Sequence, residues 1–386
     1  MPLLYNTITY LYCLYSGDFT GDYLGVSINN NYILTFSYIC SFIPYIILWN
    51  IYRRYKKSEC KTHVRVHVNL SFLKWFIYFL FFWHILVTLL FGVGQLGDDA
   101  YQAPTFIKVF IQLFNRFPVH LVGALYIALC DERKRFHEFI KIALLIIIIG
   151  LARKSISSPI FVFYIYLIFY GDKFLIWAKK NLILLSIIMV LSPYLIGGVY
   201  SFRDSLRGKE NMVELSSSQL VFGKFFGRLS SLSDTGFIME NLPYFAIQAQ
   251  ELDFYYYQRQ VLSGTLGMSF APDLTPERVL YNSLGDGSPN ISYMCGVTGN
   301  MVLAFLKSPY MLVLNLASFI LLLMITFHLA QRLSIPCNSE LALLFLISPV
   351  MSGVANECAF ISIVLLLFIL LNMVVNGTFL KYKRVD

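Results

Sequence analysis

Long runs of apolar residues recur along this chain and restrict its fold more than any other feature. A helix needs about 20 residues, at 1.5 Å each, to cross the hydrocarbon core of a bilayer. Ten segments approach or reach that length: residues 2–15, 31–51, 70–92, 106–130, 139–152, 156–171, 181–200, 309–330, 340–354 and 357–376. The pattern predicts an all-α, polytopic integral membrane helix bundle.

Several of these segments are too short for a simple span. We expect residues 139–152, 156–171 and 340–354 to be half-helices or tilted spans packed against neighbours. Residues 2–15 lack the basic start and small-residue cleavage site of a signal peptide, so we expect a short span there.

The charged residues place the segments relative to the membrane. Fifteen Lys and Arg residues lie in the connections 52–69, 131–138 and 172–180 and in the C-terminal tail, whereas connections 16–30 and 93–105 hold none. Cytoplasmic loops carry an excess of Lys and Arg, so we expect both termini inside. The net charge of +8 therefore reflects topology, and we expect no nucleic-acid partner.

This threading leaves a stretch of about 100 residues, 201–300, outside the cytoplasm. The expected organisation is N-terminal membrane helices in 1–200, a periplasmic loop in 201–300 and C-terminal membrane helices in 301–386. The loop carries seven basic and ten acidic residues and many aromatic ones. Its aromatic content argues against disorder, and we expect short helices and turns forming an ordered cap.

Common cofactor and metal motifs are absent from the sequence. There is no G-x-x-x-x-G-K-[ST] phosphate loop, no G-x-G-x-x-G turn and no C-x-x-C pair. The six histidines fall outside 201–300, and their spacing does not resemble a zinc site. We therefore expect no cofactor and no metal.

Arginines near the outer membrane face are the best candidate site residues. Arg203 and Arg207 follow the seventh segment, and i,i+4 spacing on a continued helix puts both guanidiniums on one side. Such a pair suits a diphosphate, because each planar fork can bind phosphate oxygens bidentately. The alternative is that they are interfacial anchors, paired with Asp204 and Glu210.

Other cations lie at positions that are unfavourable for a positive charge, in an outward turn or within a membrane segment. Arg153 and Lys154 occupy an outward turn, where they line a site or reach lipid phosphates. Arg116 lies within the fourth segment, next to Pro118, and an intramembrane charge is a functional-site hypothesis by default; its alternative is a structural pair with Glu357. In the loop, Arg228, Arg259 and Arg278 are candidates to complete a basic cavity, and for Arg259 the favoured alternative is a solvated charge.

The architecture resembles that of the Wzy-type O-antigen (oligosaccharide repeat unit) polymerases. Three stretches carry the resemblance: the turn 150–155 around Arg153, the Arg203/Arg207 pair, and Pro272–Arg278 followed by the Gly- and Asn-rich 285–300. The frequent Pro-Arg step of that family is Pro276-Glu277-Arg278 in this chain, which weakens the assignment of Arg278.

The resemblance implies a glycosyltransferase in the bacterial inner membrane. Such an enzyme transfers a growing glycan from undecaprenyl diphosphate onto a new lipid-linked repeat, and the donor brings its own leaving group. Arg203 and Arg207 would be catalytic, and Arg116, Arg153, Lys154, Arg228 and Arg278 would bind substrate. The implied partners are the lipid-linked oligosaccharide, membrane lipid, a chain-length regulator and a flippase. The base is left open among Asp204, Asp234, Glu240 and Glu277.

Three alternatives stay open. An O-antigen ligase of similar architecture usually has a histidine in the outer loop, and this chain has none there. A flippase or secondary transporter would show inverted repeats. A membrane acyltransferase would need an intramembrane histidine, for which His84, His120 and His328 are available.

Overall fold

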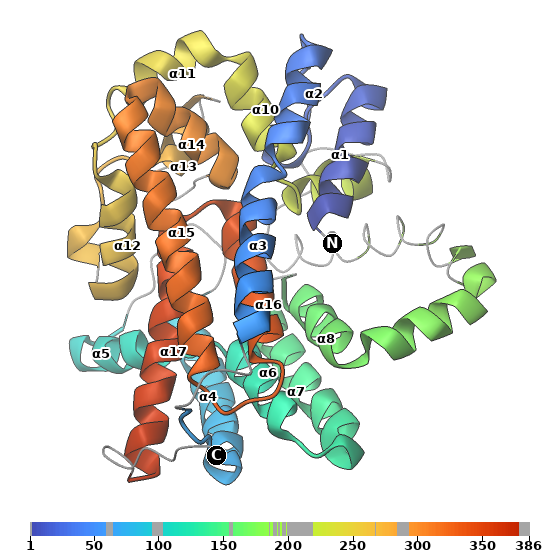
Figure 1. The fold of residues 1–386 in the computed structure, drawn as a ribbon, viewed down its shortest axis with the longest axis vertical. Helices are drawn as coiled ribbons and strands as arrows, with labels where there is room; N and C mark the ends of the chain where they lie inside the picture. Colours follow the sequence, from blue (N-terminus) through green and yellow to red (C-terminus); the bar gives the residue numbers. More distant parts are fainter. Residues whose placement is uncertain are drawn as a thin grey trace. The chain divides into compact units, whose positions relative to one another are not determined.

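The computed structural model describes residues 2–58, 65–94, 103–153, 157–184, 186, 187, 191, 194, 198, 219–266, 268–283 and 293–377. These residues form helices and turns and contain no β-strand (Figure 1). The chain divides into two compact units. The first comprises Met1–Lys57, Leu215–Phe327 and Phe345–Ile363, and the second comprises Ser58–Glu214, His328–Leu344 and Val364–Asp386.

Five helical stretches among the described residues are long and apolar enough to cross a membrane. They are Asn31–Ser58, Leu70–Phe91, Ser158–Lys180, Pro309–Gln331 and Ala355–Val375. Their lengths and compositions indicate a helical membrane protein, as the sequence predicts. The number of spans beyond these five and the side on which each terminus lies stay predictions.

The first unit is built from short helices packed on longer ones. Its elements are α1 (Pro2–Ser16), η1 (Gly21–Tyr23), α2 (Asn31–Cys40), α3 (Ile43–Ser58), η3 (Gln219–Phe226), α10 (Leu232–Glu240), α11 (Leu242–Ala249), α12 (Tyr256–Leu266), η4 (Met268–Phe270), α13 (Pro276–Ser283) and α14 (Gly296–Lys307). The helices α15 (Pro309–Gln331), α16 (Asn338–Ser352) and α17 (Ala355–Val375) contribute residues to both units.

The expected loop, residues 201–300, folds onto the first helices of the chain. Within the first unit, α10 packs against α2, α14 and α1, and η3 packs against α1. The Tyr23 ring stacks on Phe237 with centroids 4.6 Å apart, and Thr20 and Ser233 share a hydrogen bond of 2.7 Å between their hydroxyls. The prediction of short, ordered helices is confirmed for the described part of this segment, and its position outside the cytoplasm stays a prediction.

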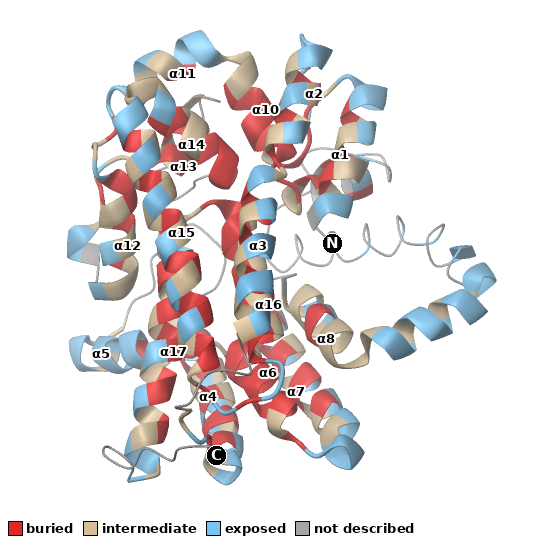
Figure 2. Ribbon diagram, in the orientation of Figure 1, coloured by how far each residue is buried: buried red, intermediate tan, exposed pale blue. Residues whose placement is uncertain are grey.

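The second unit contains α4 (Leu70–Phe91), α5 (Thr105–Phe114), α6 (Val119–Leu129), α7 (Glu132–Ala152) and α8 (Ser157–Lys180). Figure 2 shows α6 as almost entirely buried, and α4, α7 and α8 all pack against it. The helix α4 begins at an Asn69 side chain that accepts from the Phe72 N–H at 3.0 Å, and it ends at Gly92 in the left-handed conformation. These are favourable helix caps.

The prediction of one continuous fourth segment, 106–130, is wrong. The chain forms two helices, α5 and α6, separated by a turn at residues 115–118. Pro118 lacks a backbone N–H and disfavours helical geometry at the preceding residue, so the helix stops and restarts with Pro118 at its N-cap.

The predicted ends of the fifth and sixth segments are also wrong. The helix α7 begins at Glu132 rather than at residue 139, and α8 continues to Lys180 rather than ending at residue 171. The charged connections 131–138, from Glu132 onward, and 172–180 are therefore helical. Lys, Arg and Glu favour helices, so charge alone did not mark the helix ends. An acidic Glu132 at the start of α7 and Lys179 and Lys180 at the end of α8 also suit the helix dipoles.

Candidate functional site

A cavity of about 230 Å³ lies in the second unit, where α4, α6, α7 and α8 come together. Its polar lining side chains are His84 of α4, His120 of α6, Arg153 at the end of α7 and Ser158 of α8. Apolar residues of the same helices complete the wall, among them Ile146, Ile149 and Phe161. A mostly apolar cavity with a few convergent polar groups is the usual form of a ligand site.

Arg153 is the cation of this cavity. It follows α7 directly, and its backbone N–H donates to the Ile149 carbonyl at 3.0 Å, which places the side chain at the helix C-terminus. Positive groups are favoured there by the helix dipole. The side chain donates from Nη2 to the Nδ1 of His84 at 2.8 Å and from Nε to the Thr88 hydroxyl at 3.5 Å. The guanidinium is therefore held mainly by His84.

The contacts of His84 define its protonation. Arginine has donors only, so His84 Nδ1 must accept and carries no proton. The other nitrogen, Nε2, lies 3.2 Å from the Phe117 carbonyl oxygen, which can only accept, so Nε2 holds the proton and donates it. His84 is thus a neutral imidazole with both nitrogens engaged. A neutral side chain orients the guanidinium without cancelling its charge.

A glycine allows the guanidinium to reach this position. Gly94 has a φ of +75°, and a Cβ at this residue would stand 3.0 Å from Arg153 Nε and 3.2 Å from its Cζ. A larger residue would be strained by its backbone conformation and would press on the guanidinium. The turn after α4 therefore leaves room for the Arg153 side chain.

No carboxylate among the described residues pairs with Arg153. The ion pairs found there join Lys141 to Glu138, Arg228 to Asp22 and Arg259 to Asp253. Burial lowers the pKa of the Arg153 guanidinium, but arginine stays protonated at neutral pH. No described residue accepts a hydrogen bond from its Nη1. The described lining of the cavity therefore carries a net positive charge with donors available for an anion, which is the requirement for binding phosphate oxygens.

His120 is the second ionisable group in the cavity. Its ring stacks on Phe161 of α8, with centroids 4.4 Å apart and planes 17° from parallel. Within the described parts of the chain neither ring nitrogen makes a hydrogen bond, although both nitrogens of His84 do. The stack fixes the ring plane and leaves the nitrogens for a ligand or for proton transfer.

The other predicted site residues lie elsewhere. Arg116 is half-buried in the turn between α5 and α6 and does not line this cavity. Arg228 pairs with Asp22 through Nη2 at 2.7 Å and Nε at 2.9 Å, and this pair ties the cap to η1. Arg278 lies over the Tyr281 ring, with its Cζ 4.9 Å from the centroid. Arg203, Arg207 and Lys154 lie outside the described residues.

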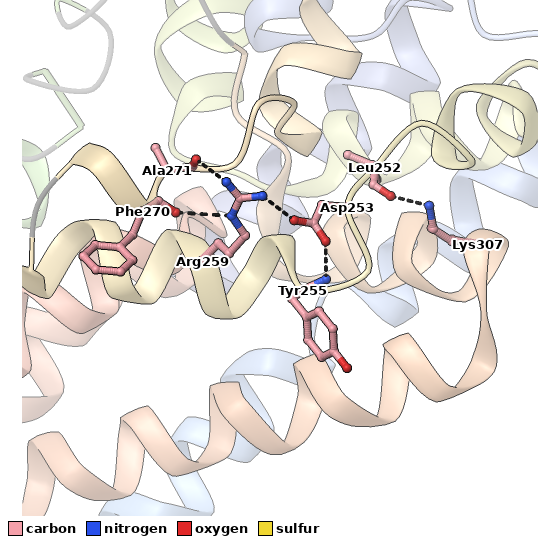
Figure 3. Close-up of polar contacts among 7 residues, drawn as sticks. All are labelled: Leu252, Asp253, Tyr255, Arg259, Phe270, Ala271 and Lys307. Carbon is pink, nitrogen blue, oxygen red and sulfur yellow. Dashed lines mark hydrogen bonds and ion pairs between the residues drawn. The ribbon is translucent and has the colours of Figure 1, made fainter.

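Arg259 was expected to complete a basic cavity or to be a solvated charge; its side chain is 37% exposed but is held in an ion pair. Figure 3 shows its guanidinium joined to the Asp253 carboxylate, at 2.6 Å, and to the carbonyls of Phe270 and Ala271, at 3.4 Å and 3.1 Å. The neighbouring Lys307 ammonium donates to the Leu252 carbonyl. Together these contacts tie the 250–255 turn to α12, to residues 270 and 271 and to the C-terminal end of α14 in the first unit.

Three carboxylates that were candidates for a catalytic base lie in the first unit. Asp234 and Glu277 are each only 5% exposed, and burial raises the pKa of both carboxyls. Glu240 accepts from the backbone N–H groups of Asn29 and Asn30, at 2.7 Å and 2.6 Å, before the start of α2. The fourth candidate, Asp204, lies outside the described residues. None of the three described carboxylates lines the Arg153 cavity.

The grouping of His84, His120 and Arg153 was not predicted from the sequence. Each histidine was recognised as an intramembrane residue, and Arg153 was recognised as a cation in a disfavoured turn, but no spacing linked them. The described residues bring together no group of three His, Cys, Asp or Glu side chains that could hold a metal ion. No family model, curated protein or solved structure matches the chain.

Proposed function

We propose that this chain is a membrane glycosyltransferase that joins oligosaccharide repeats carried on undecaprenyl diphosphate, as the Wzy-type O-antigen polymerases do. The observation that carries the proposal is the Arg153 guanidinium, which faces a cavity among membrane-associated helices, has no carboxylate partner among the described residues and keeps Nη1 available. A polyprenyl diphosphate presents an anionic headgroup at the membrane surface, which matches this arrangement.

The chemistry of such a transfer needs little beyond charge stabilisation and a base. The diphosphate is already an activated leaving group, so the reaction requires no nucleotide. The negative charge that develops on it is stabilised by preorganised donors in a water-poor site. Arg153, held from behind by a neutral His84, supplies such donors, and Arg203 and Arg207 are proposed to supply more.

Chain length of the glycan in cells tests this function. A bacterial strain lacking the gene is complemented with the wild-type chain or with a variant, and the glycan is separated on a gel. We expect a ladder with the wild type and a single repeat with Arg153→Ala, because losing one preorganised donor lowers rates about 10²–10³-fold. Arg153→Lys should restore only part of the ladder, since lysine lacks the planar fork.

A matched control comes from the same helix. Arg133 is an exposed arginine near the start of α7, so Arg133→Ala should leave the ladder intact. Immunoblots of the membrane fraction confirm equal protein levels. A normal ladder from well-expressed Arg153→Ala would overturn the proposal.

The proposal includes ten spans with both termini inside and residues 201–300 outside. Reporter fusions after Lys57, Lys180 and Asn241 test it, because each reporter is active on only one side of the membrane. We expect cytoplasmic signals at the two lysines and an outer signal at Asn241. A cytoplasmic Asn241 would remove both the cap and the proposed reaction from the outer face.

A membrane acyltransferase is the second candidate, because His120 lines the cavity with unpaired nitrogens among the described residues. An imidazole can take a proton from a hydroxyl that attacks an acyl donor. Mass spectrometry of the glycan from the deletion strain separates the two functions. An intact ladder that lacks acyl groups favours acyl transfer, whereas single repeats favour polymerisation.

A further inference from the structure

We propose that His120 is the general base of the transfer, taking the proton of the acceptor hydroxyl in the cavity where Arg153 binds the donor diphosphate. This inference rests on the proposed function, and His120 is not among the four carboxylates that the sequence offers as a base. Its basis is the geometry of the cavity. His120 and Arg153 line one space of about 230 Å³, which can bring an anion and a hydroxyl close to both.

His120 has the contacts expected of a positioned base. The Phe161 ring lies parallel to the imidazole at 4.4 Å and fixes its plane. Pro118 and Val119 precede it at the start of α6, so the ring projects from the first turn of a buried helix. Neither nitrogen has a hydrogen-bond partner in the described ranges, so one can accept a proton without first breaking a contact.

The competing groups are unsuited to this role. His84 lines the same cavity, but its Nδ1 accepts from Arg153 and its Nε2 donates to Phe117. Among the described carboxylates considered as bases, Asp234 and Glu277 are buried in the first unit and Glu240 is bound by two backbone N–H groups. His120 is therefore the ionisable side chain of the cavity that is both accessible and uncommitted.

Burial, and then the neighbouring Arg153 cation, keep His120 in its neutral, basic form. The charged or titratable groups that face it are Arg153 from α7 and His84 from α4, whereas α8 contributes Phe161 and Ser158. A second positive charge next to a permanent guanidinium is disfavoured by repulsion until a bound diphosphate offsets the charge of that guanidinium. The imidazole therefore enters the reaction neutral, as a general base must.

The proposed step transfers one proton and one glycosyl group. The acceptor hydroxyl gives its proton to the free nitrogen of His120 while its oxygen forms a bond to the anomeric carbon of the donor sugar. The bond between that carbon and the diphosphate oxygen breaks, and the electron pair leaves with the lipid diphosphate, whose charge Arg153 stabilises. The proton on His120 then passes to water or to the departing diphosphate.

The test uses the full-length chain in detergent, with lipid-linked single repeats extracted from the deletion strain as substrate. Farnesyl diphosphate serves as a separate probe of anion binding. We expect His120→Gln to bind farnesyl diphosphate like the wild type but to extend glycans about 10²–10⁴-fold more slowly, the usual range for losing a general base. Arg153→Gln should lose the binding itself.

Chemical rescue distinguishes a base from a structural residue. In His120→Gly, added imidazole should enter the emptied position and restore part of the extension rate. His137→Gly provides the matched control, because His137 is exposed on α7 and its removal should change neither rate nor imidazole dependence. Rescue of His120→Gly by imidazole, with no effect of imidazole on His137→Gly, supports the assignment of His120 as the base.

Two results would overturn the role of His120. One is a wild-type extension rate in His120→Gln, and the other is a His120→Gly chain that binds farnesyl diphosphate but is not rescued by imidazole. Failure of the proposed function has a different signature. In that case the wild-type chain itself extends no glycan, and the role of His120 falls with it.

Discussion

The hydrogen bond from Arg153 to His84 should carry most of the energy that holds the guanidinium in place. At 2.8 Å it is short and involves a charged donor, whereas the contact to Thr88 is 3.5 Å long. Hydrogen bonds to charged groups contribute about 1.5–3 kcal/mol, and a neutral one contributes about 1 kcal/mol. His84→Leu removes both the bond to Arg153 and the bond to Phe117, so we expect a loss of about 2.5–4 kcal/mol in the free energy of unfolding.

The matched variant is Thr88→Val, which keeps the volume and removes the weaker contact. Thr88 also donates to the Val93 carbonyl at 2.9 Å, so this variant should lose about 1 kcal/mol. Thermal unfolding in detergent ranks the stabilities of the two variants. Titration with farnesyl diphosphate measures how well the Arg153 guanidinium binds an anion. If the whole free energy of the hydrogen bond to His84 serves to orient the guanidinium for its ligand, His84→Leu should weaken the binding of farnesyl diphosphate about 10–150-fold.

The ranking of the two variants tests whether His84 orients the Arg153 guanidinium. A Thr88→Val chain that is less stable and binds farnesyl diphosphate more weakly than His84→Leu would contradict the role assigned to His84. Unchanged binding in a folded His84→Leu chain would show that Arg153 does not need His84 for its orientation.

Three further outcomes are expected. Burial raises the pKa of Asp234 well above its ordinary value, so this carboxyl holds its proton in the folded state. The free energy of unfolding should therefore fall as the pH rises above about 4, the pKa of an aspartate in the unfolded chain. Asp234→Asn should flatten that decline in melting scans between about pH 5 and 9. The Tyr255 N–H and then the Arg259 guanidinium lower the pKa of Asp253, so Asp253→Asn should cost at most about 1 kcal/mol at neutral pH and nothing once pH falls below the lowered pKa. Arg203→Ala and Arg207→Ala should each leave single repeats in the complementation assay, with partial ladders from the lysine variants.

Hydropathy predicted the long helices well and the interrupted ones poorly. The segment 70–92 agrees with α4 at Leu70–Phe91, because uninterrupted apolar residues and good caps define both ends. The segment 106–130 has the same apolar content but breaks at Pro118. Summed hydropathy does not register the loss of one backbone donor, although that loss decides whether the helix continues.

The distribution of charged residues predicted the candidate site more reliably than it predicted the ends of the helices. Arg153 was singled out because it contradicts the distribution of basic residues, and the structure places it in a cavity. Arg259 looked like an ordinary surface cation, and its pairing with Asp253 and two carbonyls depends on how the 268–271 turn returns to α12. A contact across such a turn is not encoded in local spacing, so sequence alone could not assign it.

The identity of the residue behind Arg153 has a consequence for the charge of the cavity. A carboxylate in the place of His84 would hold the guanidinium more tightly, with an attraction of about 4 kcal/mol for charges 4 Å apart at an effective dielectric of 20. The same carboxylate would repel an incoming phosphate by a similar amount and leave the cavity neutral. The neutral imidazole provides orientation through one short hydrogen bond and leaves the positive charge available. Because a purely structural arginine would be better served by a carboxylate, the pairing with a neutral histidine is itself an argument that Arg153 binds an anion.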